Sequence, residues 1–250
     1  MDAGGWAESG GRPTDDPPCP SSLSSPLADL VFAFHSAAFL WFTRVWLWHA
    51  TPAAAALPGS AGFGWFFRYL TFCSFTAQTG ALGLCCAAHV APAGGKAKAK
   101  LARAADDASC ALFGLANVVT LMYHAIEAST GGVVEGGHLA RPPWLGFAVH
   151  AGNAATAWAD LALGHPRTFS PRAAAASAGT VAAYCAWLLV LRGVHGAFPY
   201  PFLNALPMPA GFVGLVAGGA ALFWALFQVG RRLSAPLLRV KMRAGWPADA

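Results

Sequence analysis

Apolar residues gather along the chain into six blocks, which polar, glycine-rich or proline-rich stretches separate. Each block has about 20 residues, roughly the length that an α-helix needs to cross the hydrocarbon core of a bilayer. The blocks are residues 27–49, 65–89, 106–126, 144–164, 173–191 and 210–229. The pattern therefore predicts an all-α fold, a polytopic membrane protein built as a bundle of six transmembrane helices.

The composition supports a membrane protein over a soluble domain. Hydrophobic residues make up 56% of the 250 residues and charged residues only 11%, with a mean hydropathy of +0.48. Soluble domains carry about 25% charged residues, so this chain has too few to cover a globule in water. The net charge of +5 comes from basic residues that flank the apolar blocks, without interleaved stacking aromatics. We therefore expect the lipid bilayer as a partner, and no nucleic acid.

The basic residues predict an orientation. With six crossings, twelve of the 16 Lys and Arg residues fall on the side of the two tails, and four fall on the opposite side. The positive-inside rule then places both termini in the cytoplasm.

Residues 1–26, rich in Pro, Gly and Ser, are predicted to form a disordered N-terminal tail, and residues 231–250 a basic C-terminal tail. A basic segment followed at once by an apolar core is missing near the N-terminus, so no cleaved signal peptide is expected.

Polar side chains inside the apolar blocks are costly in hydrocarbon and are candidates for function. Thr71 lies six residues into block 65–89, and His150 lies six residues into block 144–164. Both blocks enter from the predicted non-cytoplasmic side, so both side chains should lie about 9 Å deep. A hydroxyl and an imidazole at matching depth are what a nucleophile and its general base require.

Other polar residues form stripes at helical spacing on three of the predicted helices. They are Thr71, Ser74 and Gln78; Asn117, Thr120, His124 and Glu127; and His150, Asn153 and Asp160. Each can equally be a packing residue, bonded to a backbone carbonyl or to a neighbouring helix. Asp160 lies ten residues from His150, about 15 Å along a helix, and is too far away to orient that imidazole.

No sequence signature indicates a metal or a cofactor. His49, His138 and His195 fall in or beside predicted outer loops, but no HExxH or comparable spacing supports a metal site. No phosphate-binding or dinucleotide-binding glycine motif is found. Gly214 and Gly218 form a GxxxG step, which is expected to permit close contact between helices.

Several short motifs resemble one known family. They are Arg68-Tyr69-Leu70-Thr71-Phe72 followed by Gln78, Trp144-Leu145 followed by His150, and His195 followed by Tyr200-Pro201-Phe202-Leu203. In this order and spacing, from about residue 27 to 230, the chain resembles the androgen-induced-gene and androgen-dependent TFPI-regulating protein family. The resemblance implies a six-helix membrane hydrolase that cleaves fatty acid esters of hydroxy fatty acids.

The resemblance also assigns roles to residues. It implies that Thr71 is the nucleophile and His150 the histidine of the site. The chain departs from the family pattern at Ala151, where the family commonly has Thr, and near Ala155, where it has Pro. We take Arg68, Gln78, Asn117, His124 and Asn153 as candidate supporting residues, with Arg68 placed to hold a substrate carboxylate.

Two alternatives stay open. The first is a non-enzymatic membrane regulator or lipid-binding protein, in which Thr71 and His150 only pack helices. The second is a haem-bearing electron carrier, which needs two histidines facing each other at one depth and could pair His150 only with His124. The physiological ester, the membrane that holds the protein, either an endomembrane or the plasma membrane, and the oligomeric state are not determined by the sequence.

Overall fold

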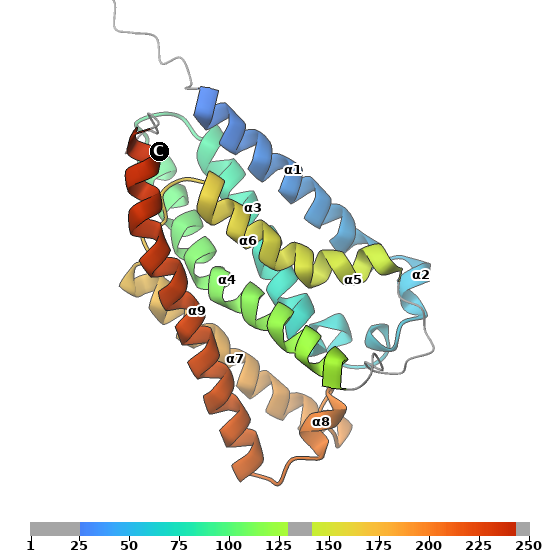
Figure 1. Ribbon diagram of the computed structural model, residues 1–250. Helices are drawn as coiled ribbons and strands as arrows, with labels where there is room; N and C mark the ends of the chain where they lie inside the picture. The colour runs from blue at the N-terminus through green and yellow to red at the C-terminus, as the bar shows by residue number, and fades with distance from the viewer. Residues whose placement is uncertain (1–25, 130–141, 244–250) are drawn as a thin grey trace, which may run out of the picture.

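The computed structural model describes residues 26–129 and 142–243, and within these ranges the chain forms helices joined by loops (Figure 1). The long helices are α1 (Pro26–Trp48), α3 (Leu70–Val90), α4 (Lys96–Ser129), α7 (Pro171–His195) and α9 (Ala210–Arg243). Shorter ones are α2 (Pro52–Ala55), α5 (Pro143–Val149), α6 (Ala151–Leu163) and α8 (Pro201–Asn204), with two 3-10 helices, η1 (Pro58–Ser60) and η2 (Trp65–Arg68). The prediction of an all-helical membrane protein is confirmed.

In the described part of the chain, five helices are long and apolar enough to cross a membrane: α1, α3, α4, α7 and α9. The fourth apolar block does not form the single helix predicted over 144–164. It breaks at His150 into α5 and α6, because the backbone there leaves the helical region with φ −111° and ψ −87°. Two shorter helices thus take the place of one, and the count of six crossings stays a prediction.

Helix α4 is the centre of the bundle. All of residues 109–119 are buried, as expected for a helix that is covered on every side. It packs against α3, α6, α7 and α9, while α1 lies on the other side of α3 (Figure 1). Because α4 packs against four other helices, it forms one wall of any space enclosed between them.

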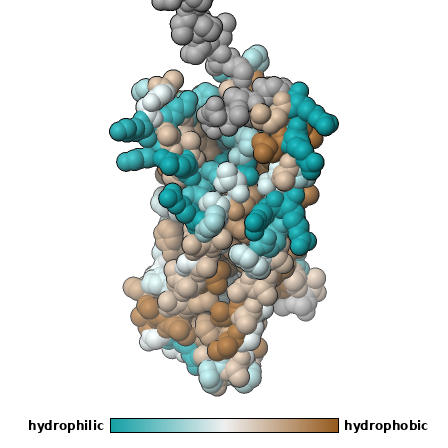
Figure 2. Space-filling view, turned by 90° about the vertical axis from the view of Figure 1, so that its left-hand side faces the viewer, coloured by the Kyte–Doolittle hydropathy of each residue, from teal (hydrophilic) through white to brown (hydrophobic). Residues whose placement is uncertain are grey.

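Two helices extend well beyond the predicted membrane segments. Helix α4 begins at Lys96, so the basic stretch between the second and third apolar blocks is largely helical, and α9 continues through the basic tail as far as Arg243. Ala, Lys, Leu and Arg are strong helix formers, so the chain stays helical after it becomes polar. The start of α1, the start of α4 and the end of α9 lie at the same end of the molecule (Figure 1). Figure 2 shows hydrophilic residues gathered over the upper part of one face and more apolar ones below.

The GxxxG step does not mediate a helix contact among the described residues. A Cβ atom added at Gly214 or Gly218 would meet nothing within 4 Å, and both residues are exposed. The two glycines face outward from α9, so the expectation of close packing within this chain is wrong.

The predicted N-terminal tail lies outside the described residues, except for Pro26, which begins α1.

Candidate functional site

Thr71 lies in the first turn of α3. Gly64, with a φ of 87°, turns the chain into η2, and Tyr69 is extended, so that α3 begins at Leu70. The amide groups of Phe72 and Cys73 both donate to the carbonyl of Tyr69. This turn holds the backbone of Thr71 and presents its side chain beside a cavity.

His150 lies at the break between α5 and α6 and is 3% exposed. The hydroxyl of Thr120 on α4 donates to its carbonyl at 2.9 Å, and the ring of Tyr123 stacks on the imidazole with centroids 3.6 Å apart. The Nδ1 atom of His150 lies 2.9 Å from the carbonyl oxygen of Gly146. Contacts from α4 and α5 thus fix both the backbone and the ring of this histidine.

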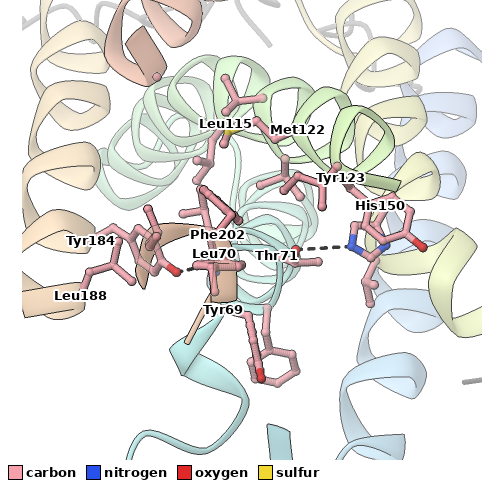
Figure 3. A pocket seen from close by; sticks show the side chains of 18 of the residues that line it. Tyr69, Leu70, Thr71, Leu115, Met122, Tyr123, His150, Tyr184, Leu188 and Phe202 are labelled. Atoms are coloured by element: carbon pink, nitrogen blue, oxygen red, sulfur yellow. Dashed lines mark hydrogen bonds between the residues drawn. The ribbon is translucent and has the colours of Figure 1, made fainter. Parts of the chain in front are cut away.

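Thr71 and His150 lie within hydrogen-bonding distance of each other. The Oγ1 atom of Thr71 is 3.4 Å from Nε2 of His150 (Figure 3). A carbonyl oxygen can only accept, so Nδ1 must carry the proton that bonds to Gly146. In that tautomer Nε2 is the acceptor, and the hydroxyl of Thr71 donates to it. This is the arrangement of a nucleophile beside its base, at the long distance common in sites without a ligand.

A cavity of about 350 Å³ opens beside this pair (Figure 3), and its walls come mostly from α3, α4, α7 and α9. Ligand sites are typically of this size or larger, mostly apolar, with a few polar groups that set orientation. The lining is largely Leu, Val, Met, Ile and Phe, and the polar exceptions include Thr71, Tyr123, His150, Tyr184 and Tyr200. The cavity can therefore hold an apolar chain whose polar group lies beside Thr71 and His150.

Two tyrosines that the sequence analysis gave no role hold the start of α3. The hydroxyl of Tyr200 accepts the amide proton of Leu70 at 2.8 Å, and the hydroxyl of Tyr184 donates to the carbonyl of Arg68 at 2.9 Å. The two hydroxyl oxygens are 3.2 Å apart. Tyr200 belongs to the motif that carried the family resemblance, but only the tertiary structure brings its hydroxyl beside Leu70, next to Thr71.

Two candidate supporting residues do not line the cavity. The guanidinium of Arg68 donates to the carbonyls of Trp65 and Pro58, and Arg68 does not line the cavity. His124 is exposed, lies 3.2 Å from a carboxylate oxygen of Glu127, and does not line the cavity either. The structure therefore supports neither Arg68 as the carboxylate-binding residue nor His124 as the partner of His150 around a haem.

The three remaining candidates are buried within the helical bundle. The side-chain amide of Asn153 donates to Ser74 at 3.0 Å, and Asn117 accepts from the indole of Trp158 at 2.8 Å. Gln78 is buried and does not line the cavity. Asn153 joins α6 to α3 and Asn117 joins α4 to α6, so these two act as ties that hold the elements around the site.

Asp160 lies at the opposite end of α6 from His150. Its carboxylate is bound by the guanidinium of Arg167, with Nε at 3.0 Å, and by Nε2 of His35 on α1 at 2.7 Å. Arg167 lies in the loop between α6 and α7 and is only 8% exposed. The carboxylate of Asp160 thus has two buried partners of its own, which no pattern in the sequence indicated.

Among the described residues, no group of three or more His, Cys, Asp or Glu side chains could hold a metal ion. His49 is buried with Nδ1 at 2.9 Å from the carbonyl of Val45, and His195 lies 3.0 Å from the carbonyl of Phe63. His138 lies outside the described residues. His49 and His195 are thus each engaged with a separate backbone carbonyl.

These features define a multi-pass helical membrane protein with a Thr–His pair beside an apolar cavity. The sequence model of the family described as FAR-17a/AIG1-like protein matches residues 30–235. The chain therefore belongs to this family, the androgen-induced gene 1 family. No match was found among curated proteins, and none among solved structures.

Proposed function

We propose that this protein is a membrane-embedded esterase that hydrolyses fatty acyl esters with Thr71 as nucleophile and His150 as base. The observation that carries the proposal is the 3.4 Å approach of Thr71 Oγ1 to His150 Nε2 at one end of an apolar cavity. Membership of a family known to include hydrolases supports it. The fatty acid esters of hydroxy fatty acids that the resemblance implied are the first substrates to test.

The chemistry follows from the two side chains. Nε2 of His150 takes the hydroxyl proton of Thr71 as Oγ1 attacks the ester carbonyl carbon, which becomes tetrahedral. The carbon–oxygen bond to the alcohol then breaks, and the alcohol leaves with the proton from Nε2. Water attacks the resulting acyl-threonine with His150 again as base, and this step releases the fatty acid and restores the hydroxyl of Thr71.

The imidazole needs no carboxylate partner for this cycle. The carbonyl of Gly146 accepts the Nδ1 proton and so holds Nε2 toward Thr71. The ring of Tyr123 lies stacked on the imidazole and limits its rotation. A backbone oxygen and an aromatic ring therefore perform the orienting role that an aspartate has in a serine protease triad.

The test is covalent labelling of the purified protein with a fluorophosphonate probe, together with ester hydrolysis. Thr71→Val keeps the shape of the side chain but removes the hydroxyl, so it should lose labelling and turnover. Thr71→Ser keeps a hydroxyl and should retain part of both. Equal labelling and turnover in Thr71→Val and the parent protein would refute the mechanism. If the folded parent protein binds fatty acyl esters but hydrolyses none, the lipid-binding alternative holds instead.

A further inference from the structure

The cavity runs away from the Thr–His pair along two antiparallel helices. Its lining residues on α4 and on α9 each follow helical spacing across twelve residues, so that the first and last are about 16 Å apart along the helix. On α4 they are Leu115, Val118, Val119, Met122, Tyr123 and Ile126, and on α9 they are Phe212, Leu215, Val216, Gly219, Ala220 and Phe223. Tyr123 stacks on His150, so this end of the α4 row lies beside the pair and Leu115 is farthest from it. The cavity is thus an elongated space with the reacting groups at one end.

Phe223 closes the far end. It is 4% exposed and packs in one apolar cluster with Leu115, the last cavity residue on α4. A Cβ atom built at Gly114 would lie 3.5 Å from its ring, so the ring is pressed against α4. One turn farther along α9, Phe227 belongs to a different cluster and does not line the cavity. Phe223 is therefore the floor.

Gly219 leaves the middle of the cavity open. It lines the cavity one turn before Phe223, and a Cβ atom added there would meet nothing within 4 Å. Its neighbour Gly218 also has nothing within 4 Å of an added Cβ, but Gly218 is exposed and does not line the cavity. A larger side chain fits at either position without a backbone clash, and only the one at Gly219 would enter the cavity.

We propose that α9 sets the length of the acyl chain that the site accepts, with Gly219 providing the room and Phe223 the end stop. This inference rests on the proposed function for its substrate, an ester of a straight-chain fatty acid whose carbonyl lies at Thr71. The acyl tail then extends from Thr71 between α4 and α9. Gly219→Leu should shorten the accepted chain, and Phe223→Ala should lengthen it.

The first experiment measures kcat/KM for p-nitrophenyl butyrate, octanoate, laurate and palmitate. In Gly219→Leu the ratio of palmitate to butyrate activity should fall by about tenfold or more, since one methylene that no longer fits an apolar pocket costs at least this much. The matched control, Gly218→Leu, should keep the length profile of the parent protein. Phe223→Ala should shift the preferred ester to a longer one. The same length profile in Gly219→Leu and Gly218→Leu overturns the inference.

A second measurement does not depend on turnover. Fatty acids of the same lengths displace a fluorescent fatty acid from the purified protein, and Gly219→Leu should lose displacement by the long acids while Gly218→Leu keeps it. If this holds while the parent protein hydrolyses no ester, the proposed function fails and the role of α9 in chain length stands. If the parent protein binds none of these acids, or if all variants bind them alike, the inference is overturned.

Discussion

His150, at the break between α5 and α6, makes several of the contacts that build the candidate site. The φ and ψ angles of His150 end α5 and begin α6, and its ring faces Thr71 while its carbonyl accepts from Thr120. A continuous helix would direct this ring by helical geometry alone. The break instead allows the ring to be positioned by Gly146 and Tyr123. We infer that orientation by the surrounding packing replaces a charged partner, which would be costly at this depth in a membrane.

At the residue scale, Tyr200→Phe should lower both stability and activity, although it leaves the side chains of Thr71 and His150 unchanged. The change removes the oxygen that accepts the amide proton of Leu70, the residue before Thr71. A buried donor left without a partner costs about 1–3 kcal/mol. We expect a lower melting temperature and a kcat reduced more than KM, because the backbone of Thr71 is less well held. Parallel kinetics and thermal unfolding in detergent check this, and a variant equal to the parent in both would contradict it.

At the element scale, α6 is held at both ends by different means. Its start is bound to α4 through the backbone of His150, and its far end to α1 and to the following loop through Asp160. Near that far end, the ammonium group of Lys241 on α9 donates to the carbonyls of Leu161 and Gly164. The buried charges of Asp160 and Arg167 thus serve to locate a helix whose other end carries His150.

Asp160→Asn tests this anchor. The substitution removes the closer of the two carboxylates beside the buried guanidinium of Arg167 and leaves Asp106 at 3.8 Å. Breaking a buried pair costs about 3–5 kcal/mol. The melting temperature should fall clearly. The matched control is Glu127→Gln, which breaks the exposed pair with His124 and should cost about 0–1 kcal/mol. Similar melting temperatures for the two variants would show that Asp160 does not anchor α6.

At the scale of the whole molecule, the long helices place the described ends of the chain together. The start of α1 and the end of α9 lie at one end of the bundle, where α4 also begins with its lysines (Figure 1). Thr71 and His150 lie toward the other end, near the starts of α3 and α9. This arrangement agrees with the prediction that both termini lie on one side of the membrane, and the positive-inside rule predicts that this side is cytoplasmic.

The orientation can be measured directly. Epitope tags at the two termini should both be accessible to antibody when only the plasma membrane is permeabilised. A cysteine introduced at Ala197, an exposed position after α7, should react with an impermeant maleimide only from the non-cytoplasmic side. Tags on opposite sides, or labelling of Ala197→Cys from the cytoplasm, would refute an even number of crossings with cytoplasmic ends.

The roles of the supporting residues could be predicted from the sequence only in part. Polar stripes at helical spacing correctly indicated side chains that face other helices, as Asn117 and Asn153 do. The spacing could not say whether such a face borders a cavity or another helix, and Arg68 and His124 turned out to face neither Thr71 nor the cavity. Tyr184 gave no signal, and Tyr200 was notable only as part of a family motif, since each reaches α3 from more than 100 residues away.

By itself the sequence determined that this is a helical membrane protein. Leaving its long apolar blocks in water, or leaving backbone groups unbonded in lipid, is costly, and both costs depend on composition and length alone. The sequence also predicted one depth for Thr71 and His150 from helical rise, although the structure begins α3 only at Leu70 and breaks the fourth block at His150. Only the tertiary structure decided that they face each other, that the helix breaks at His150, and that α9 borders the cavity with Gly219 and Phe223. These depend on the rotation and lateral packing of helices, which are set by contacts between residues distant in the chain.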